Sequence, residues 1–434
     1  MTTVRLGRRI LVAALSSGAL LAAAACGSSG SAGGASTPAS ADFSQQGDIE
    51  LWQGKDTSGN LQKQLDQFNA SHPNGKVTLH ELPDAADQQR QQMLQNTQIK
   101  NPKMAVLNVD VVWTSEFAAN GYLEPLPPEQ FPTEGMLAPA VDSATYFGKL
   151  YAYPRQSNGG LLYYRKDLLE KYDLTPPTTF EQLRAACRTI KAGEKDDKLD
   201  CYGGQFQKYE GLTVNFAEAV NGAGGVVVGD DGKANVNTPQ AEQGLGVLVD
   251  MMSSGDIPKA ALTWQEEQGR TAFQDGNLIF LRNWPYVYAL AENPKASKVA
   301  GKFDVAPLPG VTGAGVSSLG GGNYGIAKNA ANKGTAADFV KFMASPEQQK
   351  SDTLATSQPP TLSSLYADPE VVKAYPFFPT LLTSIQGAKP RPKVVAYGDV
   401  TLAIQDSAYA ALQGTTPPDA ALQTMQTKLE TLIK

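Results

Sequence analysis

The chain has 434 residues, more than the roughly 250–300 residues that one hydrophobic core usually supports, so two lobes are expected. Its composition, 41% hydrophobic and 18% charged, is that of a globular protein and argues against a largely disordered chain. The formal net charge of −6 at pH 7 argues against a basic nucleic-acid-binding surface, so no nucleic-acid partner is expected.

Residues 1–25 predict a lipoprotein signal peptide. Three arginines among the first nine residues precede an apolar run over residues 10–25, and small residues stand directly before Cys26. A positive start, a short apolar core and small residues at the cleavage site are typical of secretory signals. The cysteine after them resembles a bacterial lipobox, in which the thiol is lipidated. A plain signal peptide with an incidental cysteine stays open, as does a twin-arginine signal at Arg8 and Arg9.

Residues 26–41 predict a flexible tether because, apart from Cys26, they consist of Gly, Ser, Ala, Thr and Pro. Lipid, tether and globular body together predict an exported protein anchored to the outer face of the cell membrane by lipidated Cys26. No internal stretch reaches the roughly 18 apolar residues that would span a bilayer. Removing the three leader arginines takes the formal side-chain charge from −6 to −9, so the exported body is mildly acidic.

Two further cysteines, Cys187 and Cys201, are expected to form a disulfide. Two cysteines in an oxidising compartment favour one bridge, here closing a short, charged loop. Two separate buried thiols are the alternative.

The first part of the body alternates between predicted strands and helices. Strands are expected at residues 48–53, 76–82 and 104–112, with helices at 61–70 and 87–100. The third strand is a continuous apolar run, as is typical of a buried parallel strand. This order predicts a doubly wound α/β lobe.

The second part predicts another lobe, reached by an extended segment at residues 151–162 that contains Pro and Gly. Helices are expected at 163–171 and 179–192. Further strand–helix material to residue 290, short strands and turns over 299–326, and mostly helix after residue 335 complete the prediction.

Several segments, taken together, resemble the maltose/trehalose-binding group of family 1 extracellular solute-binding proteins. They occur in the family's order and spacing over nearly all of the chain from residue 48: VLNVDVVWTSEFAANGYLEPL (Val106–Leu126), GKLYAYPRQSNGGLLYYRKDLLEKY (Gly148–Tyr172), QKYEGL (Gln207–Leu212), FQDGNLIFLRNWPYVY (Phe273–Tyr288), VAPLPG (Val305–Gly310), SLGGGNYGIAK (Ser318–Lys328) and KPRPKVVAY (Lys389–Tyr397).

The resemblance implies an α/β, two-lobed periplasmic-binding-protein-like fold with discontinuous lobes, hinge strands and an interlobe ligand cleft. We expect residues 42–157 with 301–344 in the N-terminal lobe, and 158–300 with 345–434 in the C-terminal lobe. The implied ligand is a small carbohydrate, an α-glucoside disaccharide such as trehalose or maltose. The implied partners are the permease subunits of an ABC importer and their ATPase. No cofactor, metal or enzymatic activity is implied, and a monomer is expected.

Three residues are expected to contact the sugar. Asp110 ends a buried strand at the carboxyl edge where open α/β sheets bind ligands, and its carboxylate can accept hydrogen bonds from two hydroxyls. Trp284 follows a predicted strand and can stack on a pyranose face. Arg391 lies between prolines, which restrict its backbone. The resemblance places ligand contacts at these positions. The alternatives are a helix cap or a salt-bridge partner at Asp110, a core tryptophan at Trp284 and a surface arginine at Arg391.

The resemblance implies further ligand-binding positions at Arg90, Gln156, Asn158, Tyr209, Glu210, Tyr286, Gly321, Gly322 and Asn323. Gln156 and Asn158 stand where relatives that bind trehalose or maltose can carry Tyr and Asp. Gly322 stands where such relatives have Trp, so one stacking surface is lost. These departures leave the exact sugar open and allow longer oligosaccharides.

Other classes of function stay open. An exported glycosidase would need two carboxylates facing one glycosidic bond, and no such pair stands out by motif. His72 and His80 show no metal-ligand or catalytic-triad spacing. A binding protein for a polyamine and a cell-wall scaffold are the remaining alternatives, although Arg391 would repel a polyamine.

Overall fold

The structure is a computed structural model that describes residues 41–433. The predicted signal peptide, the lipidation site at Cys26 and residues 26–40 of the tether lie outside the described residues. Within residues 41–433, no helix is both long enough and apolar enough to cross a membrane.

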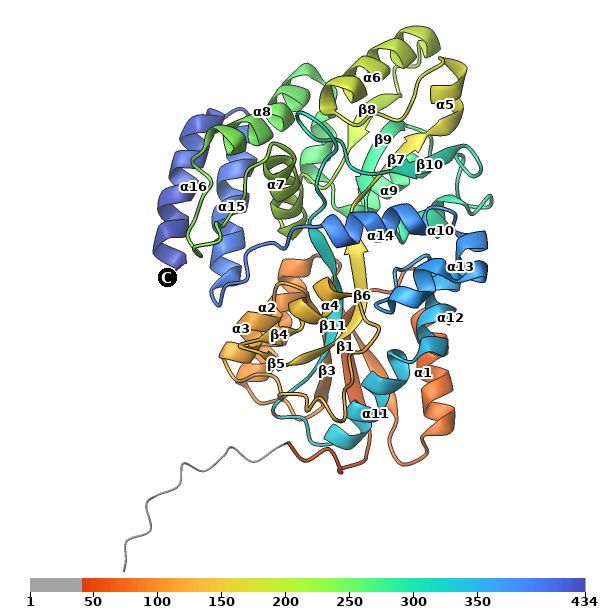
Figure 1. Cartoon of the computed structure of the whole chain (residues 1–434), viewed down its shortest axis with the longest axis vertical. Coiled ribbons are helices and arrows are strands. Elements are labelled where there is room, and N and C mark those ends of the chain that lie inside the picture. Colours follow the sequence, from red (N-terminus) through yellow and green to blue (C-terminus); the bar gives the residue numbers. More distant parts are fainter. Residues whose placement is uncertain (1–40, 434) are drawn as a thin grey trace, which may run out of the picture. The chain divides into compact units, whose positions relative to one another are not determined.

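The first lobe is built on a five-stranded sheet in the order β2-β1-β3-β11-β6. Figure 1 labels β1, β3, β6 and β11 of this sheet. The strands β1, β2 and β3 are parallel, whereas β11 runs antiparallel to both β3 and β6. Two helices connect the first three strands, so the predicted strand–helix alternation is confirmed. The bounds are β1 (Ile49–Gly54), α1 (Asn60–Ser71), β2 (Val77–Leu82), α2 (Ala86–Gln98), β3 (Met104–Asp110), β6 (Ala152–Gly159) and β11 (Leu319–Ile326).

The apolar pattern of α1 explains how this lobe packs. Leu61, Leu65 and Phe68 recur at helical spacing and are buried. The ring of Phe68 meets that of Phe339 edge-on at a centroid distance of 5.2 Å. Since Phe339 belongs to α11 (Lys333–Met343), this contact joins two segments that are far apart in the sequence.

The second lobe contains a four-stranded sheet in the order β10-β7-β9-β8. Only β8 and β9 are parallel neighbours; β7 pairs antiparallel with both β9 and β10. Large helices pack with this sheet in one hydrophobic core. The bounds are β7 (Leu161–Arg165), α6 (Phe180–Glu194), β8 (Asp200–Gly203), α7 (Glu210–Gly222), α8 (Pro239–Ser254), β9 (Leu278–Asn283), β10 (Phe303–Ala306), α15 (Tyr397–Leu412) and α16 (Pro418–Leu432).

The predicted helix at residues 163–171 is partly wrong. Residues 163–165 belong to β7, and the helix α5 covers only Lys166–Lys171. Leu161, Leu162 and Tyr163 are fully buried, and β7 is paired on both sides. Because such a strand is buried on both faces, it lacks the alternation that would have revealed it, and tertiary pairing decides its conformation.

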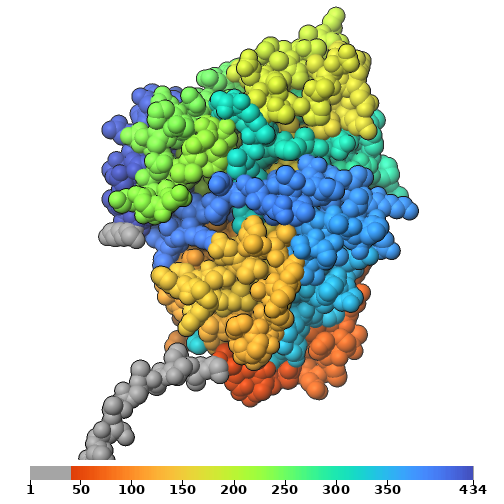
Figure 2. Space-filling view, viewed as in Figure 1, coloured from red at the N-terminus to blue at the C-terminus, as the bar shows by residue number. Residues whose placement is uncertain are grey.

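The chain crosses between the lobes at the predicted place. β6 ends at Gly159 in the first sheet and β7 begins at Leu161 in the second, so Gly160 is the link. The exact lobe boundaries stay a prediction. Strand pairing puts β10 beside β7 in the second sheet, whereas α12 (Pro346–Thr356) contacts α1 of the first lobe. In Figure 2 the blue C-terminal segments lie across the middle of the molecule, between the orange and the yellow surfaces.

A disulfide joins Cys187 on α6 to Cys201 on β8. Both residues are buried, so the bridge fixes the helix against the edge of the second sheet. The other elements are α3 (Thr114–Ala119), α4 (Ala138–Ser143), β4 (Thr145–Tyr146), β5 (Lys149–Leu150), η1 (Lys259–Thr263), α9 (Glu266–Gln274), α10 (Val287–Ala291), η2 (Ser363–Ala367), α13 (Pro369–Ala374) and α14 (Phe378–Gly387).

Candidate ligand-binding cleft

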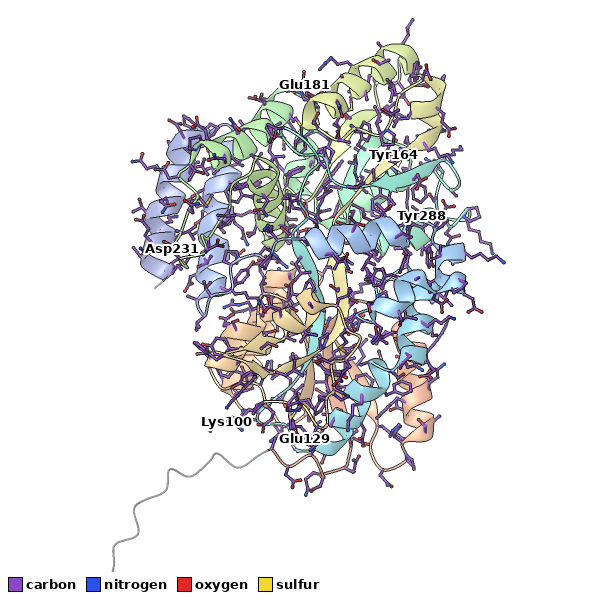
Figure 3. All side chains as sticks on the ribbon, in the orientation of Figure 1. Lys100, Glu129, Tyr164, Glu181, Asp231 and Tyr288 are labelled. Carbon is purple, nitrogen blue, oxygen red and sulfur yellow. A yellow bond between two sulfur atoms is a disulfide. The ribbon has the colours of Figure 1, made fainter. Side chains whose placement is uncertain are left out.

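A cavity of about 560 Å³ is lined by elements of both lobes. On the first-lobe side, its wall includes the end of β1 with the following loop of residues 55–58, Asn108 on β3 and Gln156 on β6. On the second-lobe side, it includes the start of α9 and Tyr286. Tyr288 on α10, labelled in Figure 3, is not part of the cavity wall, because its ring packs against Phe303 and Phe377. The volume lies in the range of about 300–1,000 Å³ that is usual for small-molecule sites.

The cavity wall is rich in groups that bind hydroxyls. Carboxylates and amides accept or donate hydrogen bonds, and Tyr286 adds an aromatic side chain. Two cations also line it, Lys55 and Arg155. The five carboxylates are Asp56, Asp84, Glu266, Glu267 and Asp352.

Hydrogen bonds from neighbouring side chains hold two of these carboxylates in place. The hydroxyl of Tyr209 donates to Glu266 Oε2 at 2.7 Å, and that of Tyr286 donates to Glu267 Oε1 at 2.6 Å. Burial raises the pKa of Glu266, while the bond from Tyr209 opposes that change. Tyr209 and Tyr286 therefore orient acids of the cavity wall.

A buried ionic cluster brings together three of the predicted residues. Arg391 Nη2 donates to Asp110 Oδ1 at 2.9 Å, and Arg391 Nη1 donates to Glu210. Glu210 also accepts from the hydroxyls of Tyr397, at 2.5 Å, and Thr401, at 2.7 Å. Burial raises the pKa of Glu210 to about 7, although Arg391 works in the opposite direction. Arg391 is 3% exposed, so it is a buried arginine and not a surface one.

Asp87, on α2 of the first lobe, contacts two elements of the second lobe. Its Oδ2 accepts from the backbone N–H of Glu210 at 2.7 Å, and its Oδ1 accepts from Gln405 Nε2 at 3.2 Å. Glu210 is the first residue of α7, and the N-cap residue of that helix supplies no side-chain cap. Asp87 of the first lobe therefore caps the N-terminus of α7 in the second lobe. The positive end of the helix dipole stabilises its negative charge there.

Trp284 is held by a second buried ion pair. Arg282 Cζ lies 4.0 Å from the centroid of the Trp284 ring, which is a cation–π contact. The guanidinium of Arg282 in turn donates to both carboxylate oxygens of Glu218, at 2.7 and 2.6 Å. This chain of contacts fixes the orientation of the indole.

A side chain at any of the three glycines of β11 next to the cluster would meet a different neighbour. A Cβ on Gly320 would lie 2.7 Å from Trp284 Cζ3. Gly321 has a φ of 117°, and its Cβ would lie 2.2 Å from the carbonyl oxygen of Gln156, so both conformation and space demand glycine. A Cβ on Gly322 would lie 2.6 Å from Asn108 Oδ1.

The family described as bacterial extracellular solute-binding protein matches residues 54–350. The chain belongs to this family. A probable ABC transporter-binding protein of Deinococcus radiodurans is 33% identical over 363 residues, which cover 81% of this chain and 86% of the relative.

Solved structures of this kind share the fold. A maltose-bound structure of T. maritima MalE3 is 33% identical, covers 89% of this chain and 99% of its own, and superimposes with a TM-score of 0.85. The GacH receptor of Streptomyces glaucescens is 24% identical with a TM-score of 0.79, covering 89% of this chain and 98% of its own. The two-lobed α/β fold expected for this solute-binding protein is therefore confirmed.

The predicted ligand residues of this solute-binding protein fall into groups. Gln156 and Tyr286 line the cavity, and Tyr209 lies behind its wall. Asp110, Arg391 and Glu210 form the ionic cluster. Asn158, Trp284, Gly321 and Gly322 lie at or beside β11, where Asn158 is paired with Gly320.

Two predicted residues lie elsewhere. Arg90 forms an ion pair with Glu116 of the first lobe. Asn323 is fully buried and donates from Nδ2 to Ser143 Oγ at 3.0 Å, so its amide faces the interior of the first lobe. The sequence reasoning missed Asp87, Asn108 and the acids that begin α9. A carboxylate in the first turn of a helix was the only local signal that Asp87, Glu266 and Glu267 offered.

Proposed function

We propose that this chain is the substrate-binding lipoprotein of an ABC-type importer that captures a small carbohydrate, an α-glucoside disaccharide such as trehalose or maltose. The observation that carries the proposal is the cavity of about 560 Å³, whose wall combines carboxylates, amides and Tyr286. Its size and hydrogen-bonding groups suit an oligohydroxylated ligand of two or three rings. The 33% identity to the maltose-bound MalE3 structure supports an α-linked glucose ligand.

Residues next to the cavity complete the proposed site. Asp110 lies opposite Gly322 in the strand register, and Gly322 also pairs with cavity-lining Gln156. In the proposal, sugar hydroxyls take over hydrogen bonds that Asp110 and Arg391 now make to each other, and Trp284 offers a ring face. Hinge closure around the sugar presents the form that the permease recognises.

The proposed place of action is the cell surface. The chain is exported and held at the outer face of the cell membrane by lipidated Cys26. Its partners are two permease subunits and their ATPase, and it acts as a monomer that binds and releases its ligand without chemical change.

A second candidate ligand is a small organic cation such as a polyamine. The observation that favours it is the excess of carboxylates over cations on the cavity wall, five against two. Several of these acids already have local partners, however. Asp56 accepts from the N–H of Leu61 at the start of α1, and Glu267 pairs with Arg270. Since such contacts neutralise or occupy the acids, we favour the sugar.

A thermal-shift screen of the purified protein tests the proposal against its rival. The panel contains trehalose, maltose, sucrose, glucose, maltodextrins and spermidine. A ligand that binds only the folded state stabilises it by mass action, by about 2.7 kcal/mol at one hundred times its Kd. A rise in Tm with an α-linked disaccharide supports the proposal. A rise with spermidine alone overturns it in favour of the cation.

A further inference from the structure

Asn108 presents to the cavity a buried amide oxygen that no described residue satisfies. It lies on β3 two residues before Asp110, so both side chains leave the same face of the strand. Asn108 lines the cavity, and its Oδ1 is buried without a hydrogen-bond partner among the described residues. A buried amide oxygen without a partner is unfavourable and therefore calls for an explanation.

The neighbouring amide of Gln156 does not share this property. Its Oε1 accepts a hydrogen bond from Arg155 Nη1, the adjacent residue of β6. Arg155 thus occupies the acceptor of Gln156, whereas the acceptor of Asn108 is left for another group.

Gly322 explains how Asn108 reaches this position. β11 and β3 pair antiparallel. In their register Gly322 lies opposite Asp110, and two positions along each strand Tyr324 lies opposite Asn108. A Cβ on Gly322 would lie 2.6 Å from Asn108 Oδ1 and 3.4 Å from its Cγ. Gly322 has an ordinary backbone conformation, unlike Gly321 with its φ of 117°, so the backbone itself would accept a side chain. The amide of Asn108 therefore takes the space that a side chain at position 322 would need.

We infer that Asn108, together with the glycine at position 322, is a specificity determinant of the cleft. Its amide oxygen accepts a hydrogen bond from a ligand hydroxyl, and it occupies space that a larger residue 322 would fill. The inference rests on the proposed function and adds a residue to it. This arrangement selects for a ligand with a hydroxyl within reach of Asn108, and against a ligand that places an apolar group there.

A cycle between protein variants and deoxygenated sugars tests this assignment. Isothermal titration measures the affinity of the purified wild type, Asn108→Ala and Asn120→Ala for the disaccharide that binds and for its monodeoxy analogues. Asn120 is exposed at the end of α3 and controls for the loss of an asparagine outside the cavity. We expect Asn108→Ala to weaken binding roughly tenfold, the size of one unpaired hydrogen bond, and Asn120→Ala to leave it unchanged.

The analogue that lacks the contacted hydroxyl separates a direct contact from a general disturbance. The wild type is expected to bind this analogue about tenfold more weakly than it binds the parent sugar. Asn108→Ala is expected to bind the analogue and the parent sugar with equal affinity. Equal affinities of wild type and Asn108→Ala for every sugar would overturn the inference while leaving the proposed function intact. If the wild type binds no sugar at all, the proposed function fails and the ligand role of Asn108 fails with it.

The packing part is tested without ligand. Gly322→Leu alone is expected to lower Tm because the new side chain meets the amide of Asn108, and the combination with Asn108→Gly is expected to restore most of the loss. A Gly322→Leu variant that is equally destabilised in both backgrounds would show that Asn108 does not control the space at position 322.

Discussion

Glu210 should make the stability of this protein depend on pH in a predictable direction. Burial raises its pKa to about 7 in the folded state, against an ordinary value of 4.5. The folded state therefore binds the proton more tightly than the unfolded state does. Its contribution to stability is fully present below about pH 4.5 and is lost as the pH rises to about 7. This pKa difference corresponds to about 3 kcal/mol of unfolding free energy.

The perturbation is Glu210→Gln, which keeps the shape and removes the titration. Urea unfolding at about pH 4.5, 5.5, 6.5 and 7.5 gives the free energy of unfolding of each protein, by linear extrapolation to zero urea. Between the ends of this series, the wild type is expected to lose about 3 kcal/mol relative to the variant. The exposed Glu129→Gln serves as control and should follow the wild type. Parallel pH profiles of wild type and Glu210→Gln would refute the reasoning, even if the variant is uniformly less stable because Arg391 has lost a partner.

Three further variants, two single and one double, test contacts in the two lobes. Asp87→Asn weakens the contact between α2 and α7, and we expect it to lower the free energy of unfolding by about 1.5–3 kcal/mol in urea; an unchanged midpoint would show that the contact contributes nothing. Glu218→Gln leaves the buried Arg282 without its carboxylate and should cost about 3–5 kcal/mol and reduce sugar affinity through Trp284; loss of stability with normal affinity would separate the ion pair from the site. Replacing Cys187 and Cys201 by serine opens a loop of 14 residues and should cost about 3 kcal/mol, measured against the oxidised wild type; equal stability would contradict a structural role.

Local patterns predicted the first lobe well because its strands and helices carry their own signals. Leu61, Leu65 and Phe68 mark α1. The mostly apolar run predicted as a strand at residues 104–112 marks β3, which ends at Asp110. The β7 strand was missed in part because a strand buried on both faces shows no alternation, and the following helix was extended backward over it.

Site residues could be predicted only where a side chain suited to binding hydroxyls stood at a position that the family resemblance marks as a ligand contact. Asp110 and Arg391 were singled out, but nothing in the sequence shows that they meet, since 281 positions separate them. The contact of Asp87 with Glu210 spans 123 positions and has no local signal either. The role of Asn108 depends on what stands opposite it on β11, which only the strand register reveals.

Calorimetric titration of the purified protein with maltose and with trehalose tests the central claim most directly. The account predicts saturable binding of one equivalent of at least one of these sugars, strongly weakened in Asp110→Ala. Absence of binding to every sugar of the panel, with saturable binding of spermidine, would contradict it and would make the acids of the cavity wall a site for cations.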